Sequence, residues 1–401
     1  MTKTFSISSS EDNLVIPDGI VVSSDAFSDH STRWAVSKTT LRGGVQEGVE
    51  VIMVDNGAMS IRILPTRGMS ILDAHVGETR LGWDSPVKQV VHPRYVNLEA
   101  QGGLGWLDGF NELMVRCGVS FAGAPGDDGG QFLTLHGRIG NLPATRVEVI
   151  IDEAASPRNR VRGLVEEKRF KLGVFELWTE IATELGSHSF QINDELTNLS
   201  EYEQEYQLIY HTNFGRPFLE AGAQFVAPVD QVTPLNDYAA HDLKTYQEYL
   251  GPTAGYGEQV YCLSMRTDDS GGTTTALQNR NGDLGVALRY DARSLPFFNL
   301  WKNTDTETDG YVTGLEPATG FPFNRSVERE HGRVPFPMHH VRAREVGERV
   351  PLALVNVVQV IAALVVDGAV RVRRDRPVGS RMCLVVRQPG LRRVHRPGRG
   401  F

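Results

Sequence analysis

The chain has 401 residues, enough for one large β domain or two medium-sized domains, and its hydrophobic content of 40% is ordinary for a globular protein with a sizeable core. A net charge of −8 and a pI near 5.8 argue against nucleic acid as the main partner, because phosphate binding needs a basic field that most of this chain lacks. The three cysteines, Cys117, Cys262 and Cys383, are few and far apart, which argues against a disulfide framework and favours a reducing compartment.

Short strand-like runs dominate the rest of the pattern. They often alternate between apolar and polar residues and end at Gly, Pro, Asn or Asp, which is typical of antiparallel sheets. In chain order, we expect strands at Val49–Val54, Met59–Leu64, Ala144–Ile151, Glu176–Leu185, Phe190–Asn198 and Glu205–Tyr210.

Helical periodicity is hard to find. The best candidate is a short helix at Asp237–Leu250, and a weaker one lies in "PRYVNLEAQ" at 93–101. The 41 glycines and 20 prolines suit a chain with many turns, so the economical interpretation is an all-β sandwich. With no fixed-period repeat and no clear linker, we expect one domain over residues 1–341, of which about 40 N-terminal residues form an added strand or arm.

The segment 342–401 differs from what precedes it. It holds thirteen Arg, no Lys and four carboxylates, a local charge of +9 (13 − 4), which leaves −17 for residues 1–341. One hypothesis is a basic interaction tail for an anionic surface. The hypothesis that we favour is an out-of-frame or otherwise non-native C-terminus of a high-GC gene, which the coding DNA would decide.

The sequence predicts neither a secretory signal nor a transmembrane helix. The N-terminus "MTKTFSISSSEDNLVIPDG" is polar and has no apolar core of a secretory signal. The longest apolar run, Leu352–Val366, is interrupted by Asn356 and Gln359 and is shorter than a bilayer span. We therefore expect a cytoplasmic protein without membrane association.

Polar residues that could act as acids, bases or ligand contacts lie at three predicted strand ends. His136 and Arg138 lie in "TLHGRIG", His211 and Asn213 follow an apolar strand in "IYHTNFGRP", and Glu316 lies between Leu315 and Pro317. A carboxylate flanked by apolar residues is liable to desolvation, which raises its pKa and makes it a better base near neutral pH. The ends of strands are also where side chains can meet a ligand.

These residues allow several interpretations. A metal site is disfavoured because no HxH, HExxH or CxxC spacing is present. An acid and base pair needs two groups whose surroundings separate their pKa values, and spacing alone cannot show that they meet. Each residue also has a purely structural interpretation: His136 bonds to a loop, His211 caps a strand end, and Glu316 pairs with Arg325 or Arg138.

Six motifs add a family resemblance. "ILPTRGMSI", "WDSPVKQVVHP", "GGLGWLDGFNELMVRCGV", "LHGRIGNLPA", "YHTNFG" and "WKNTDTETDGYVTGLEPATGFPFNR" occur in this order between about residues 45 and 333. Together they resemble the aldose 1-epimerase (galactose mutarotase-like) superfamily, particularly its DUF4432 branch. The resemblance implies an antiparallel β-supersandwich whose concave face holds a sugar, with strands that continue past residue 335.

The resemblance also implies roles for individual residues. Glu316 matches the family's general base, His211 its general acid, and His136 a second sugar-contacting histidine, whereas Arg67 is a looser match to an arginine near the sugar. The base would take the proton of the C1 hydroxyl while the acid protonates the ring oxygen. The ring opens, the C1–C2 bond rotates, and closure gives the other anomer, with no cofactor or metal.

Further residues are expected to shape the ligand site. Trp83, Trp106 and Trp301 can offer apolar faces to sugar C–H groups, with core packing as the alternative for the first two. Arg138, Asn213 and Lys302 can donate to hydroxyls or to an anionic group of the substrate.

Two function classes remain open at this stage. The first is an aldose 1-epimerase acting on a monosaccharide or derivative, and the second is a carbohydrate-binding protein or different sugar chemistry on the same scaffold. Glu316 and His211 facing each other, roughly 5–8 Å apart, would favour catalysis. A bidentate pair between Glu316 and an arginine would favour binding alone.

Overall fold

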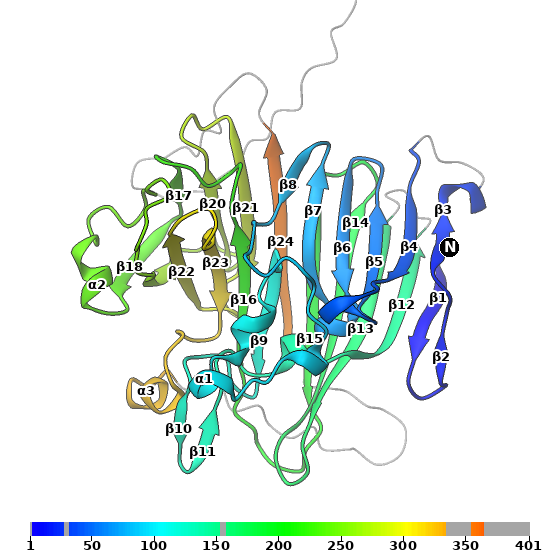
Figure 1. Cartoon of the computed structure of the whole chain (residues 1–401), viewed down its shortest axis with the longest axis horizontal. Helices are drawn as coiled ribbons and strands as arrows, with labels where there is room; N and C mark the ends of the chain where they lie inside the picture. Colours follow the sequence, from blue (N-terminus) through cyan, green and yellow to red (C-terminus); the bar gives the residue numbers. More distant parts are fainter. Residues whose placement is uncertain (1, 28–31, 153–157, 334–353, 365–401) are drawn as a thin grey trace, which may run out of the picture.

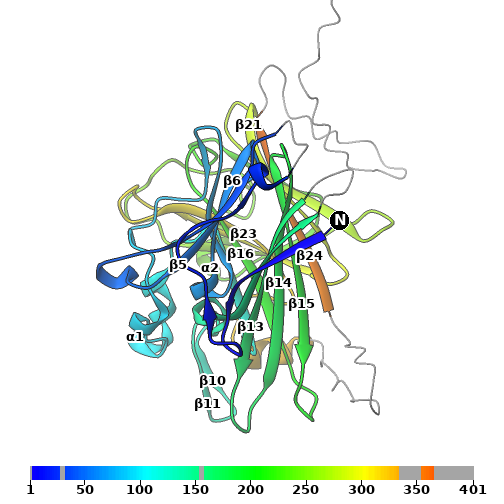
Figure 2. The same cartoon turned by 90° about the vertical axis from the view of Figure 1, so that its right-hand side faces the viewer.

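The fold is a sandwich of two large antiparallel sheets (Figure 1). The computed structural model describes residues 2–27, 32–152, 158–333 and 354–364. In the view of Figure 2, strands β13, β14, β15 and β24 of one sheet lie to one side of β5 and β6 of the other, and helix α1 lies beyond β5 and β6. The prediction of an all-β sandwich is confirmed.

The larger sheet has 12 strands and carries the site described below. Its order is β18-β19-β22-β23-β16-β9-β7-β6-β5-β4-β3, and β8 pairs with β7. The strands are β3 (Gly19–Ser23), β4 (Ala35–Thr40), β5 (Glu50–Asp55), β6 (Met59–Leu64), β7 (Ser70–Val76), β8 (Thr79–Leu81), β9 (Met114–Val119), β16 (Gln207–Phe214), β18 (Val229–Pro234), β19 (Gln259–Met265), β22 (Phe297–Thr304) and β23 (Tyr311–Ala318).

The second sheet has 10 strands in the order β17-β20-β21-β24-β15-β14-β13-β12-β1-β2. They are β1 (Thr2–Ser9), β2 (Leu14–Val15), β12 (Ala144–Asp152), β13 (Arg158–Lys168), β14 (Val174–Glu184), β15 (Ser189–Asn198), β17 (Gln224–Val226), β20 (Gly272–Gln278), β21 (Leu284–Asp291) and β24 (Leu354–Leu364). A separate hairpin joins β10 (Gly126–Asp128) to β11 (Gln131–Leu133).

Alternation along the strands separates the core from the outer faces. In β13 every second residue is buried, as expected for a strand with one face on the core and one toward solvent. Strands β9, β16 and β23 are instead buried at every position, because their second face lies under a separate aromatic cluster. The inward-facing Arg116 of β9 and Tyr210 of β16 both bond to Asp194 of β15, which joins the two sheets.

The α-helices of the described residues are few and short. They are α1 (Ala100–Gly103), α2 (Asp237–His241) and α3 (Arg325–Glu330). The predicted helix Asp237–Leu250 is therefore wrong beyond His241. The residues that follow pair with another segment instead, since Phe225 N donates to Gln247 O and Tyr249 N donates to Ala223 O. The weaker candidate at 93–101 forms only a 3₁₀ turn, Pro93–Tyr95, and the start of α1.

Strand β24 lies beyond residue 341, the predicted end of the domain. It occupies the middle of the 10-stranded sheet, between β21 and β15 (Figure 1), with Val358 paired to Ile192 and to Tyr290. Sheet structure thus continues into the Arg-rich segment as far as Leu364, and the rest of that segment lies outside the described residues. None of the helices in the described part of the chain is long and apolar enough to cross a membrane.

Candidate functional site

Four neighbouring strands at the centre of the larger sheet, β9, β16, β23 and β22, present the candidate residues on one face. Tyr210 of β16 points into the core, so the period of two along a strand directs His211 to the opposite, outer face. Asn213 and, on β23, Glu316 share that face. The apolar floor there is a cluster separate from the main core, with Val115 and Cys117 of β9, Ile209 of β16 and Val312 of β23 among its members.

His211 and Glu316 are in direct contact. His211 Nε2 lies 3.1 Å from Glu316 Oε1, and both side chains are almost fully buried. The pair is closer than the separation of roughly 5–8 Å that we expected for groups serving one sugar. The expected distance was too long because the C1 hydroxyl oxygen and the ring oxygen are bonded to the same carbon, so their partners can be neighbours. Within the described residues no arginine pairs with Glu316, and Arg325 bonds to Ser120 O instead.

Asn213 fixes the tautomer of His211. Its amide nitrogen donates to two carbonyl oxygens, Glu112 O at 3.1 Å and His211 O at 3.2 Å. The amide oxygen of Asn213 must therefore face His211 Nδ1, 2.6 Å away, so that Nδ1 carries the proton and donates it. In the neutral ring Nε2 is left as an acceptor directed at Glu316.

Burial moves the pKa values of the two groups in opposite directions. It lowers the pKa of His211 to about 3, assisted by the nearby His136 and opposed by the hydrogen bond to Asn213. It raises the pKa of Glu316 well above its usual value, assisted by the Glu258 carboxylate and opposed by Asn299. The pair as described is thus neutral, with the proton on Glu316 and an acceptor nitrogen on His211.

His136 joins the same cluster from a tight turn. Its backbone has a φ of 59°, and its Nδ1 donates to Ala122 O at 2.9 Å, so Nε2 is the free acceptor of the neutral ring. The ring centroid lies 5.5 Å from that of His211 and 4.7 Å from that of Trp106. Among the described residues no three His, Cys, Asp or Glu side chains form a metal-binding group.

Aromatic rings surround His211. Phe110 and Trp301 lie 5.2 and 5.3 Å from its ring centroid, and Trp106 lies at 6.0 Å. Trp83 and Trp106 are buried and pack against Phe110, which fits the core-packing alternative for those two. Trp301 is only partly buried, and its Nε1 donates to Glu258 Oε2. It therefore offers the most accessible indole face of the cluster.

Asn299 is a site residue that our sequence analysis missed. It lies opposite Glu316 in the β22–β23 pair, so both side chains leave the same face of the sheet. Asn299 is fully buried, and its side chain interacts with the Glu316 carboxyl. Within the described residues its amide group has no other hydrogen-bond partner, so at least one of its two polar atoms is unpaired. Buried polar atoms without partners are rare, and here they indicate a place for a polar ligand.

Lys302, a predicted ligand contact, points away from the site. It pairs with Thr313 on the opposite face of β22, and its ammonium donates to Tyr246 O and Glu248 O. A contact of Lys302 with a ligand at Glu316 is inconsistent with this geometry. Arg138 is partly buried, and Arg169 and Glu167 are the charges that act on it, so its contact with the ligand stays a prediction.

Arg67 has a structural position. It is buried and forms an ion pair with Glu112, Nε to Oε1 at 2.7 Å. Its remaining contacts are Val91 O, Gly109 O and Asn141 Oδ1, all within the protein. Glu112 O also accepts hydrogen bonds from the Asn213 amide and the Trp83 indole. By holding Glu112 in place, Arg67 therefore stabilises the positions of Asn213 and Trp83 rather than contacting a ligand.

The shifted histidines predict acid lability. The folded pKa values, about 4 for His136 and about 3 for His211, lie below the unfolded value of 6.5. Their contribution to stability is present above pH 6.5 and is lost as the pH falls toward 4, by about 1.4 kcal/mol per pH unit for each ring. Urea unfolding at pH 7, 6 and 5 measures the free energy of unfolding, which should fall less steeply with decreasing pH for His136→Gln than for the wild type. Equal slopes would contradict this, and His241→Gln, at an exposed position, is the control.

Comparison with known proteins agrees with the sheet architecture. The model of the DUF4432 family, a domain of unknown function, matches residues 46–345. A solved structure of a candidate aldose 1-epimerase from Klebsiella pneumoniae is 39% identical, with a TM-score of 0.85 over 91% of this chain and 92% of that chain. The comparison with curated proteins gives no match.

A more distant structure shares the fold alone. The galactose 1-epimerase of Lactobacillus acidophilus is 11% identical, with a TM-score of 0.50 over 82% of this chain and 98% of that chain. The fold is therefore that of the galactose mutarotase-like sandwich, as the motifs predicted.

Proposed function

The chain belongs to the DUF4432 family, and from that premise we propose that it is an aldose 1-epimerase-type isomerase that interconverts the anomers of a monosaccharide or sugar derivative. The observation that carries the proposal is the direct contact of His211 and Glu316, buried beneath aromatic rings at 3.1 Å. A carboxyl and an imidazole whose pKa values are driven apart form an acid and base pair.

The reaction moves one proton between two oxygens of the same carbon. Glu316, as carboxylate, takes the proton of the C1 hydroxyl, and His211, as imidazolium, gives a proton from Nε2 to the ring oxygen. The C1–O5 bond breaks, an open-chain aldehyde forms, and rotation about C1–C2 precedes closure to the other anomer. On closure the two groups exchange roles, so each returns to its starting state.

Contact between the two groups also explains how the ionised pair can arise. The neutral pair and the carboxylate–imidazolium pair contain the same proton, and transfer from Glu316 Oε1 to His211 Nε2 converts one into the other. Burial favours the neutral pair, whereas sugar hydroxyls that donate to the carboxylate favour the ionised pair. Asn213 holds Nδ1–H in both states, so the ring keeps its orientation.

Neighbouring residues supply the contacts that orient the sugar. The Asn299 amide, beside Glu316, and the Nε2 atom of His136 provide hydrogen-bonding groups that the described residues do not fully satisfy, and Trp301 provides an indole face for sugar C–H groups. A purely binding role would be favoured by an arginine locked onto Glu316. The described residues contain no such pair, which supports catalysis over binding alone.

The test is a panel of aldoses and their acidic derivatives, each freshly dissolved as one anomer and followed by polarimetry. The proposal predicts faster mutarotation for at least one sugar than in matched buffer, in proportion to protein concentration. Binding without acceleration, seen as saturable changes in Trp fluorescence, would instead identify a carbohydrate-binding protein.

The His211–Glu316 pair leaves no room for a side chain at Gly314. A Cβ atom there would lie 2.4 Å from Glu316 Oε1 and 3.2 Å from His211 Cε1. We expect Gly314→Ala to displace the carboxyl and lower kcat/KM by about 100-fold, at a cost of about 1–3 kcal/mol in unfolding free energy. Kinetics and urea unfolding measure both. Gly251→Ala is the control, because its added carbon would meet only Ala221 Cβ, at 3.3 Å, and no atom of the pair. Unchanged kinetics of Gly314→Ala would contradict the placement of Glu316.

A further inference from the structure

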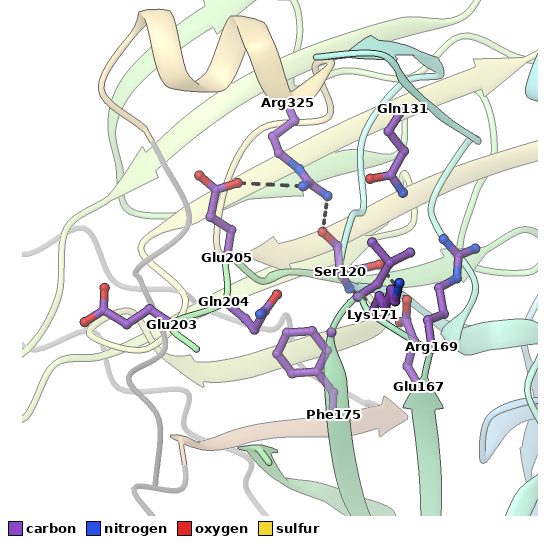
Figure 3. A pocket seen from close by; sticks show the side chains of 12 residues that line it. Ser120, Gln131, Glu167, Arg169, Lys171, Phe175, Glu203, Gln204, Glu205 and Arg325 are labelled. Carbon is purple, nitrogen blue, oxygen red and sulfur yellow. Dashed lines mark hydrogen bonds and ion pairs between the residues drawn. The ribbon is translucent and has the colours of Figure 1, made fainter. Parts of the chain in front are cut away.

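A polar cavity lies where the end of β13 and the start of β14 meet α3. It has a volume of about 340 Å³ and is formed by the segment after β9, the end of β13, the start of β14 and α3 (Figure 3). Neither His211 nor Glu316 lines it. The volume is at the lower end of the range for small-molecule sites. The charged side chains of the cavity are Glu167, Arg169, Lys171, Glu203, Glu205 and Arg325, and Ser120 lines it beside them.

Two of the carboxylates in this cavity are already occupied by the protein. Glu167 is buried and accepts from Val119 N at 2.8 Å and from the Ser120 hydroxyl at 2.5 Å. Glu205 pairs through both oxygens with Arg329, and one of them also lies 3.7 Å from Arg325 Nη1. These acceptors have little capacity left for a ligand.

Two of the three cationic side chains are in the opposite situation. Arg169 and Lys171 form no hydrogen bond or ion pair through their charged groups within the described residues. Arg325 is largely buried and partly engaged, since its Nη1 lies 3.4 Å from Asp128 Oδ2 and its Nη2 donates to Ser120 O, but its Nε has no partner among the described residues. Figure 3 shows the guanidinium groups of Arg169 and Arg325 on either side of Ser120 and Gln131.

Arg138 adds a further positive charge beside the cavity. Burial and the nearby Arg169 lower the pKa of Arg138, while Glu167 acts in the opposite direction. The charged group of Arg138 also makes no hydrogen bond or ion pair within the described residues. Arg138 and Arg169 lie close together, and the nearby Glu167 is already bonded within the protein. The guanidinium donors of the two arginines are therefore in excess of their acceptors, which favours the binding of an anion.

We propose that this cavity binds a small anionic molecule through Arg169, Lys171 and Arg325, with a phosphate or carboxylate group as the recognised chemistry. The proposal does not rest on the function of the Glu316 site. Planar guanidinium groups bind both kinds of anion in a bidentate manner, and the buried Phe175 ring supplies an apolar wall for the rest of the molecule. An inorganic phosphate would use the cations alone, whereas a phosphorylated or carboxylated sugar would also fill the volume.

Isothermal titration with the full chain tests this. The probes are inorganic phosphate, a hexose 6-phosphate and gluconate, each at constant ionic strength set with sodium chloride. We expect saturable binding of at least one probe, weakened 10-fold or more in Arg169→Gln/Lys171→Gln. Both residues are partly or fully exposed, so the fold should persist, as circular dichroism can verify.

The control is Arg158→Gln, which removes an exposed arginine at the start of β13, the strand whose other end precedes Arg169, and should leave the dissociation constant unchanged. Tighter binding of the hexose phosphate than of phosphate, or of gluconate than of either, identifies the source of the anion. No saturable binding of any probe, or equal affinity in the double variant and the wild type, would overturn the proposal.

Discussion

Glu316→Gln is expected to lower the rate of enzyme-catalysed anomer exchange by about 1,000-fold, within the 10²–10⁴ range typical of positioned acid and base groups. Glutamine keeps the size of the side chain but can neither accept nor return the proton of the C1 hydroxyl. His211 then has no partner at Nε2 with which to share a proton, although Asn213 still holds the ring. Initial rates by polarimetry, on the sugar that the panel identifies, measure the effect.

Two variants sharpen this result. Glu316→Asp keeps the carboxyl but withdraws it from His211, so a rate between those of the wild type and the glutamine variant is expected. Glu176→Gln changes a carboxylate on β14 in the other sheet and should leave the rate unchanged. If Glu316→Gln retained the wild-type rate, Glu316 would have no role as the base.

Arg67→Met is expected to destabilise the protein by about 3–5 kcal/mol, because it leaves Glu112 as a buried carboxylate without its ion-pair partner. Arg67 and Glu112 are both almost completely buried, and Arg67 also joins Val91 O and Gly109 O. The effect on sugar affinity should follow only from the lost support of Asn213 and Trp83. Urea unfolding at pH 7 gives the free energy.

The matched control for this change is Arg42→Met. Arg42 also pairs with a glutamate, Glu47, at 3.2 Å, but the pair is exposed, so a loss of about 0–1 kcal/mol is expected. A stable Arg67→Met protein with a raised KM would show instead that Arg67 contacts the sugar, as the family resemblance implied.

Alternation and turn residues were sufficient to predict several strands. The runs Met59–Leu64 and Ala144–Ile151 coincide with β6 and β12 to within one residue, because turns and a sharp change in polarity bound each of them. The helix at Asp237–Leu250 failed beyond His241. Its later residues pair with the start of β17, and such long-range pairing overrides local helix propensity.

For the site, the resemblance brought His211, His136 and Glu316 together, which spacing alone could not do. The period of two along β22 could have improved the prediction: Trp301 and Lys302 are adjacent in a strand and cannot face the same ligand, whereas Asn299 and Trp301 can. The roles of Arg67 and Arg138 depend on residues distant in sequence, Glu112 and Arg169, so no local pattern reveals them.

The most direct test of the account is two-dimensional exchange NMR between the anomeric proton signals of an aldose, recorded with the wild-type protein and with His211→Gln at several protein concentrations. If His211 and Glu316 catalyse anomer exchange, the exchange rate rises linearly with the concentration of wild-type protein and returns nearly to the buffer rate in the variant. A buffer rate for every sugar with the wild-type protein, or an unchanged rate in His211→Gln, would contradict it.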